Sequence, residues 1–306
     1  MQKTLTSDVV LTGVGLHSGK AVEMRISPAP VETGIWFRRT DVTGQDPYIA
    51  ARWNLAQHSP LCTKLVNQDG VSISTVEHIM AGLAGCGINN ALVELNGPEV
   101  PILDGSAHGF VTAILQAGVI EQAAAVRAIQ VVNPVRVSNG DAWAELVPSD
   151  ALTMDFEIDF SDAAIGHQKK SMALANGAFV HELCDSRTFC RNADVEQMRA
   201  NGLALGGTLA NAVVVEGSQV LSPGGLRHKD EAVRHKMLDA LGDLSLAGAP
   251  ILGGYTAYKG GHTLTNQLLC ALFDAPDAYR FVTCDASTVA RLPGADVTAS
   301  DVRRLA

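Results

Sequence analysis

Hydrophobic and polar positions follow the same order in the two halves of the chain. Each half begins with apolar residues that alternate with polar ones around a glycine turn, at Ser18-Gly19 and at Asn139-Gly140, which predicts a β-hairpin. A strand is expected next in each half, over residues 34–38 and 152–160. A helix, a strand and a second helix are then predicted, at residues 75–84, 89–95 and 105–117 and again at residues 231–247, 250–258 and 263–273.

The agreement in spacing indicates that one α+β unit has been duplicated. The separation of His78 and Ser106 differs by a single position from that of His235 and His262. We therefore expect an α+β fold of two similar domains, each a sheet packed with two helices, with the helices layered between the sheets. The expected domains are residues 1–127, with an insert at about 43–73, and residues 128–285, with an insert at about 161–222, followed by a tail at residues 286–306.

The two inserts distinguish the halves from each other. The first carries a predicted strand at residues 61–66 and a turn at Asp69-Gly70. The second carries a predicted helix at residues 193–200, a glycine-rich break at 202–207 and a strand at 212–216. The second insert is the more unusual, so we expect it to shape specificity, with the ligand at the seam where the first helices of the two halves meet.

Composition narrows the class of protein. With 306 residues, 47% of them hydrophobic and 18% charged, the chain can form large cores. The net charge of −9 argues against nucleic acid as the main partner. No run of apolar residues is long enough for a membrane span, and the six cysteines form no CxxC pair. We expect a cytoplasmic protein with reduced thiols and no stable membrane insertion.

Four residues on the two first helices suggest a metal site. His235 and Asp239 are four positions apart, so a helix places both on one face. His78, in the corresponding helix of the first half, can supply a third ligand, and the adjacent Glu77 is a spare carboxylate. Two histidines and one carboxylate suit a catalytic zinc ion with an open position for water. The same ligand set also suits Fe²⁺.

Each of these residues also has a structural interpretation. Ser74 and Glu77 match a helix capping box, and His78 on an apolar helix could be a hydrogen-bonded core histidine. The pair of His235 and Asp239 could be an ordinary surface contact within one helix. His262 follows two glycines and could be a helix cap. If it instead lies near the metal site, it is a candidate general acid that Asp243 would orient.

The sequence resembles the family of UDP-3-O-acyl-N-acetylglucosamine deacetylases, which act in lipid A synthesis in Gram-negative bacteria. The resemblance covers about residues 3–284. It is carried by the runs TGVGLHSGK at 12–20, ISTVEH at 73–78, PILDGS at 101–106, SRTF at 186–189, VRHKMLD at 233–239 and AYKGGH at 257–262. The chain departs from the family pattern at Ala142, Cys190, Asn192, His228 and Ala232, none of which is an expected metal ligand.

The resemblance implies a zinc-dependent amidase with one Zn²⁺ per chain, which hydrolyses the N-acetyl amide of UDP-3-O-acyl-N-acetylglucosamine and releases acetate. It implies metal ligation by His78, His235 and Asp239, and catalytic roles for Glu77 as general base, His262 as general acid, Thr188 at the oxyanion, Asp243 beside His262, and Lys236 in holding the substrate. Positions matching the family's substrate contacts are Leu16, Cys62, Phe160, Phe189, Val195, Ala204 and Val214.

Two other functions fit the residues themselves. The same metal site could belong to an amidohydrolase that acts on a different N-acyl sugar or on a peptide. The polar residues His235, Asp239 and Asp243, which follow one face of a helix, could also belong to a non-catalytic scaffold, which would bind no metal. The expected partner is the acylated UDP-sugar alone, and we expect the enzyme to be a monomer.

Overall fold

Two β-sheets with the same strand order form the framework of the chain. The computed structural model describes residues 1–59 and 61–305. The first sheet has the order β2 (Val9–Val14), β3 (Ala21–Pro28), β9 (Ala91–Leu95), β4 (Ile35–Arg39) and β5 (Tyr48–Ala50). The second repeats it with β12 (Val135–Asn139), β13 (Ala142–Pro148), β19 (Ile251–Tyr258), β14 (Thr153–Asp159) and β15 (His167–Ala173).

Strand directions match as well as strand order. In each sheet the central strand, β9 or β19, is antiparallel to the hairpin strand on one side and parallel to the next strand on the other. The alternation of apolar and polar residues in the sequence predicted a strand with one buried face. Val22, Met24 and Ile26 of β3 are all buried, as expected. The duplicated α+β plan is therefore confirmed.

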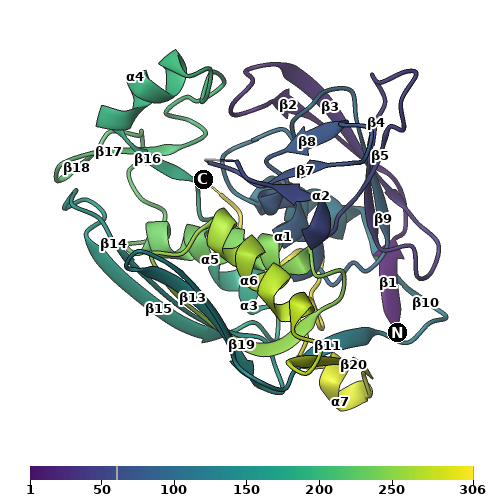
Figure 1. Cartoon of the computed structure of the whole chain (residues 1–306). Helices are drawn as coiled ribbons and strands as arrows, with labels where there is room; N and C mark the ends of the chain where they lie inside the picture. The colour runs from purple at the N-terminus through teal and green to yellow at the C-terminus, as the bar shows by residue number, and fades with distance from the viewer. Residues whose placement is uncertain (60, 306) are drawn as a thin grey trace.

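The helices lie between the two sheets, as expected. Figure 1 shows them in the middle of the molecule, with one sheet on either side. The first half contributes α1 (Glu77–Gly85) and α2 (His108–Ala117), and the second contributes α5 (Glu231–Ser245) and α6 (His262–Asp274). Each sheet can bury one face against this shared layer, which makes the core continuous between the two halves.

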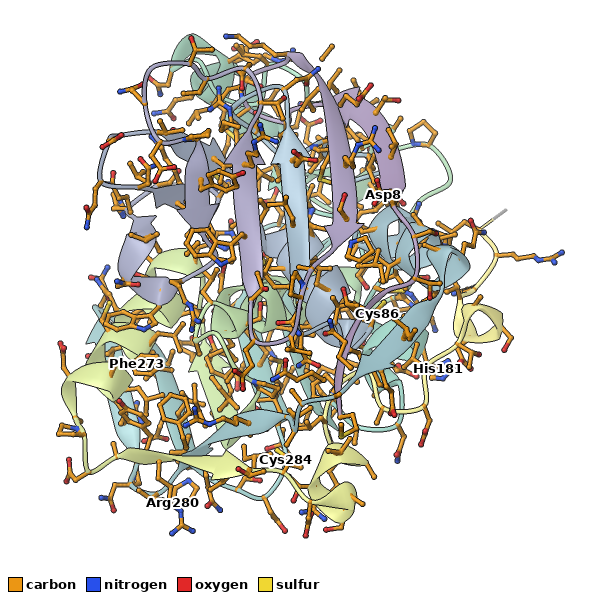
Figure 2. All side chains as sticks on the ribbon, turned by 90° about the vertical axis from the view of Figure 1, so that its right-hand side faces the viewer. Asp8, Cys86, His181, Phe273, Arg280 and Cys284 are labelled. Carbon is orange, nitrogen blue, oxygen red and sulfur yellow. The ribbon has the colours of Figure 1, made fainter. Side chains whose placement is uncertain are left out.

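Two further strands extend the second sheet, and another two form a separate pair. The sheet is extended beside the start of β19 by β11 (Arg127–Val131) and β20 (Tyr279–Thr283). A separate pair is formed by β1 (Gln2–Leu5) and β10 (Val119–Gln122). In the side view of Figure 2, the first sheet occupies the upper part, and β20, near the labelled Arg280 and Cys284, lies at the opposite end.

Each expected insert contains a small three-stranded sheet. The first has β6 (Ala56–Gln57), β7 (Lys64–Val66) and β8 (Ser72–Ser74), preceded by a 3-10 helix at Trp53–Leu55. The second has β16 (Phe189–Arg191), β17 (Val213–Glu216) and β18 (Gln219–Val220), with α3 (Ala178–Glu182) and α4 (Asn192–Ala200). Strands β5 and β15 also fall within the residue ranges expected as inserts, so the repeated unit extends into both ranges.

The last residues of the described chain pack onto the two halves. They form α7 (Ala286–Val289) and a 3-10 helix at Ala299–Asp301, and the side chains of Leu292 and Ala295 between them are buried. None of the helices in the part of the chain that the structure describes has the length and apolar content that a membrane crossing requires. The domain boundaries given above stay a prediction.

A glycine allows α1 and α5 to approach each other closely. A side-chain carbon added to Gly242 of α5 would overlap the backbone carbonyl of Glu77, the first residue of α1. Backbone of this kind cannot move aside as a flexible side chain can. The contact therefore needs glycine at position 242. Gly242 lies one helical turn after Asp239, and Glu77, which it meets, is the residue before His78.

We predict that Gly242→Ala destabilises the protein. In a helix this change alone would stabilise by about 1 kcal/mol through helix propensity. Overpacking against Glu77 is expected to reverse the sign and lower the free energy of unfolding by about 1–3 kcal/mol in urea titrations. Gly97→Ala is the control, because its added carbon would lie 3.6 Å from Val22 in ordinary contact. An unchanged or higher stability of Gly242→Ala would contradict the close-packing argument.

Candidate metal centre between the two halves

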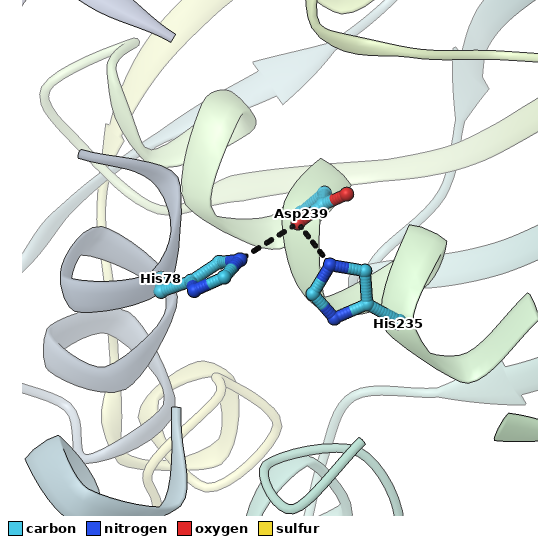
Figure 3. A group of neighbouring side chains, drawn as sticks. All are labelled: His78, His235 and Asp239. Atoms are coloured by element: carbon cyan, nitrogen blue, oxygen red, sulfur yellow. Dashed lines mark ion pairs between the residues drawn. The ribbon is translucent and has the colours of Figure 1, made fainter. Parts of the chain in front are cut away.

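Three buried side chains from the crossing helices converge on one point. His78 projects from α1, and His235 and Asp239 project from successive turns of α5 (Figure 3). The Nε2 atoms of His78 and His235 lie 3.5 and 3.3 Å from the same oxygen, Oδ1 of Asp239. Donor atoms of all three residues lie within 4.8 Å of one another. This separation is suited to ligands that surround one ion.

The convergence leaves a buried oxygen without a hydrogen-bond partner. Asp239 Oδ1 is buried and accepts no hydrogen bond from the residues that the structure describes, although its other oxygen accepts one from Lys236 Nζ at 2.8 Å. An unpaired buried carboxylate oxygen is costly unless a cation or a donor meets it. Two imidazole nitrogens and this oxygen form a donor set that fits a divalent metal ion.

The charge states of the ligands also fit a metal. The carbonyl of Ser186 can only accept, so His235 donates its Nδ1 proton to it at 3.0 Å, which leaves Nε2 free for ligation. Burial lowers the pKa of His235 to about 4 and so favours the neutral ring. Burial opposes ionisation of Asp239, but the neighbouring His235 ring and the Lys236 ammonium outweigh it and hold the pKa of that carboxyl well below its usual value.

Glu77 is not the capping residue that its sequence context suggests. Helix α1 begins without any side-chain cap, so the Ser74–Glu77 capping box does not form. The Glu77 carboxylate is instead buried beside the three converging side chains, where it accepts a hydrogen bond from the backbone N–H of Thr63 at 3.0 Å. Burial raises the pKa of this carboxyl. Its other oxygen lies 3.9 Å from His262 Nε2.

His262 completes the group and is oriented by Asp243. It is the first residue of α6, which has no side-chain cap, and its Nδ1 lies 2.8 Å from Asp243 Oδ2. Thr63, whose importance the sequence did not indicate, donates its hydroxyl proton to the other oxygen of Asp243. Burial opposes protonation of His262, but Asp243 and Glu77 more than compensate and raise the pKa of its imidazole to about 9.

A cavity of about 650 Å³ opens over these residues. Of the residues expected at the site, the cavity is lined by Leu16, Glu77, His78, Phe160, Thr188, Phe189, His235, Lys236, Asp239 and His262. Asp243 lies behind His262, and Cys62 is buried with its Sγ 3.4 Å from the Ser59 hydroxyl. The expected positions Val195, Ala204 and Val214 do not line the cavity.

Helix α4 covers the cavity with a face that the sequence reasoning did not identify. The lining residues from this helix and its end are Asp194, Gln197, Met198, Asn201 and Leu203. The first four recur at helical spacing, which puts Val195 on a different face. Helical periodicity within residues 193–200 was the signal that could have found them.

A second cavity of about 120 Å³ lies elsewhere between the halves. Its lining is mainly apolar and includes Met80, Leu83, Leu244 and Leu292. It is lined by none of the ligand or carboxylate residues described above, so the larger cavity is the candidate site.

Comparisons with known proteins show the family of this chain. A family model described as LpxC, UDP-3-O-acyl N-acetylglycosamine deacetylase, matches residues 2–274. Curated proteins named UDP-3-O-acyl-N-acetylglucosamine deacetylase are similar over most of their length. The protein of Shewanella frigidimarina is 48% identical over 286 residues, 93% of either chain. That of Idiomarina loihiensis is 48% identical over 288 residues, again 93% of either chain. That of Mannheimia succiniciproducens is 48% identical over 284 residues, 92% of this chain and 93% of its own. This chain therefore belongs to the UDP-3-O-acyl N-acetylglycosamine deacetylase family.

Proposed function

We propose that this chain hydrolyses the N-acetyl amide of UDP-3-O-acyl-N-acetylglucosamine with one zinc ion held by His78, His235 and Asp239. The products are acetate and UDP-3-O-acyl-glucosamine, as required in the committed step of lipid A synthesis. The observation that carries the proposal is the convergence of these three side chains on the unpartnered Asp239 Oδ1. Fe²⁺ suits the same ligands and is the alternative metal.

Amide hydrolysis requires a better nucleophile than free water and a protonated leaving amine. A divalent ion, when bound, supplies the positive charge that polarises the amide carbonyl and makes water more acidic. Glu77 takes the proton from the attacking water, because its carboxylate is buried next to His78 and faces the cavity. Its hydrogen bond from the Thr63 N–H holds that carboxylate in place.

Three other residues around the cavity stabilise the oxyanion, protonate the leaving amine and hold the substrate. Thr188 lines the cavity, and its hydroxyl donates a hydrogen bond to the developing oxyanion without losing its proton. His262, kept as an imidazolium by Asp243, gives its proton to the departing amine. Lys236 also faces the cavity and holds the substrate while it neutralises Asp239.

The acyl chain is held by the apolar part of the cavity. Phe160 and Phe189 pack edge to face with ring centroids 5.4 Å apart, and Leu16, Met198 and Leu203 line the same space. Each methylene group buried there contributes about 0.8 kcal/mol, which favours acylated over plain UDP-sugar. Cys62, Val195, Ala204 and Val214 do not line the cavity, so the proposal gives them no contact with the acyl chain.

The proposal includes a monomeric enzyme in the cytoplasm. All six cysteines are free thiols, which agrees with a reducing compartment. The UDP group gives the substrate the polarity of a water-borne nucleotide sugar, so no stable insertion of the enzyme into a membrane is needed.

Metal removal and substrate trimming test the activity itself. We expect acetate release from UDP-3-O-acyl-N-acetylglucosamine to stop after dialysis against a chelator and to return with Zn²⁺. His78→Ala is expected to lose bound metal. Turnover that persists in metal-free protein would refute the proposed chemistry.

The substrate without its acyl chain tests the apolar part of the cavity. Burial of about four methylene groups would make kcat/KM for UDP-3-O-acyl-N-acetylglucosamine on the order of a hundredfold higher than for UDP-N-acetylglucosamine.

We predict that Glu77→Gln keeps its metal and loses turnover. The amide preserves the shape of the side chain but cannot accept a proton, so kcat should fall roughly 10²- to 10⁴-fold. Glu77→Ala should behave in the same way. Metal content by mass spectrometry and initial rates are the measurements, with Glu121→Gln, an exposed carboxylate on β10, as the control. Near-normal rates in a metal-loaded Glu77→Gln protein would exclude the general-base role.

Asp243→Asn is expected to shift the alkaline limb of the pH–rate profile to lower pH. The carboxylates facing His262 are Glu77 from α1 and Asp239 and Asp243 from α5. Protonated His262 is lost as pH rises through its pKa of about 9, and removal of the closest negative charge lowers that pKa. Asp274→Asn, at the far end of α6, is the control. An unmoved alkaline limb in Asp243→Asn would show that another group sets it.

A further inference from the structure

A buried ion pair joins the helix of the metal ligands to the segment that carries Thr188. Glu231, the first residue of α5, is 1% exposed, and Arg187 is 6% exposed. One oxygen of Glu231 accepts hydrogen bonds from the backbone N–H and the Nε of Arg187, at 3.0 and 2.9 Å. The other accepts from Arg187 Nη2 at 3.1 Å. A paired guanidinium and carboxylate in this bidentate arrangement fix both distance and orientation.

A second arginine secures the same carboxylate. The backbone N–H of Arg227 donates to Glu231 at 2.7 Å. Its guanidinium donates to Asp104 of the first half at 2.9 Å and to the carbonyl of Asp185 at 2.7 Å. Glu231 thus accepts four hydrogen bonds, and the segment on either side of Arg187 is tied to both halves of the molecule.

The segment held in this way reaches the site at two positions, one on either side of Arg187. The Ser186 carbonyl accepts the Nδ1 proton of His235, one turn along α5 from Glu231. Thr188 lines the cavity, and its backbone is fixed by hydrogen bonds to Gly105 and Val213, at 2.7 and 2.8 Å. Arg187 lies between these two positions, so the Arg187–Glu231 pair sets where Thr188 stands relative to the ligand helix.

We infer that Glu231 and Arg187 are positioning residues that hold the Thr188 hydroxyl at its catalytic distance from the metal centre. The inference rests on the function proposed above, in which Thr188 donates to the oxyanion. Neither side chain of the pair lines the cavity, so any effect on the reaction has to pass through Ser186 and Thr188. A displacement of about 1 Å at such a donor costs on the order of a hundredfold in rate.

A double-mutant cycle on Glu231 and Thr188 tests the inference. Glu231→Gln keeps the size of the side chain but replaces one acceptor oxygen with an NH₂ group, which cannot accept. Where this group replaces the second oxygen, it faces two donors, Arg187 Nη2 and the Arg227 N–H. We expect kcat of folded protein loaded with one zinc per chain to fall about 10- to 100-fold, with KM changed less than about threefold. Thr188→Val alone should also lower kcat. Added to Glu231→Gln, it should cause less than about a threefold further loss, because the donor is already misplaced.

The controls separate positioning from stability. Glu94→Gln removes an ion pair with Arg38 in the first sheet, 2.6 Å in length and distant from the cavity, and should leave kcat within about twofold. An unpaired buried guanidinium can prevent folding. Arg187→Lys therefore provides a second variant for the same cycle, because lysine keeps the positive charge but cannot form the bidentate pair with Glu231.

The outcomes distinguish this inference from the proposed function. Losses that multiply in the double variant, or a metal-loaded Glu231→Gln with unchanged kcat, would overturn the positioning role and leave the metal-dependent activity intact. An unchanged kcat in Thr188→Val would overturn the positioning role and the oxyanion role of Thr188 together. A coupled loss with normal metal content supports the inference.

Discussion

The site depends on the close crossing of α1 and α5, which Gly242 makes possible. Each half of the molecule supplies part of the candidate metal site, and neither half contains all three of the residues that could bind the ion. The crossing brings His78 of one half to within 3.5 Å of Asp239 of the other. Because backbone touches backbone at Gly242, small changes in the angle between the helices are resisted by hard contacts. The duplicated fold thus provides two rigid helices, and the seam between them provides the chemistry.

Burial of so many charges in one seam has a cost that the surrounding contacts offset. Glu77, Asp239 and Asp243 are all nearly inaccessible to water. Thr63 donates to two of them, and Lys236 and His262 supply positive charge. The Asp239 oxygen that faces both histidines remains without a donor. A buried carboxylate oxygen left in this state is destabilising by itself, and in the proposed function a cation meets it, which is typical of a functional site.

The sequence predicted the elements that follow from local periodicity. Alternation in 21–28 and helical spacing in 231–245 depend on neighbours in sequence, and both were recognised correctly. Glu77 shows the limit of such reasoning, because its local context matches a capping box while its true partner is the N–H of Thr63, directly before β7. The face of α4 and the pair of Arg187 with Glu231 were missed for related reasons. The former depends on which side of a short helix meets the cavity, and the latter joins residues 44 positions apart.

A crystal structure of the zinc-loaded protein, with anomalous data collected on both sides of the zinc absorption edge, tests the central claim most directly. Our account predicts one strong anomalous peak between α1 and α5, bound by Nε2 of His78, Nε2 of His235 and Oδ1 of Asp239. A peak bound only by residues of one half would contradict the claim that the crossing of the two helices assembles the site. So would a peak that does not contact Asp239.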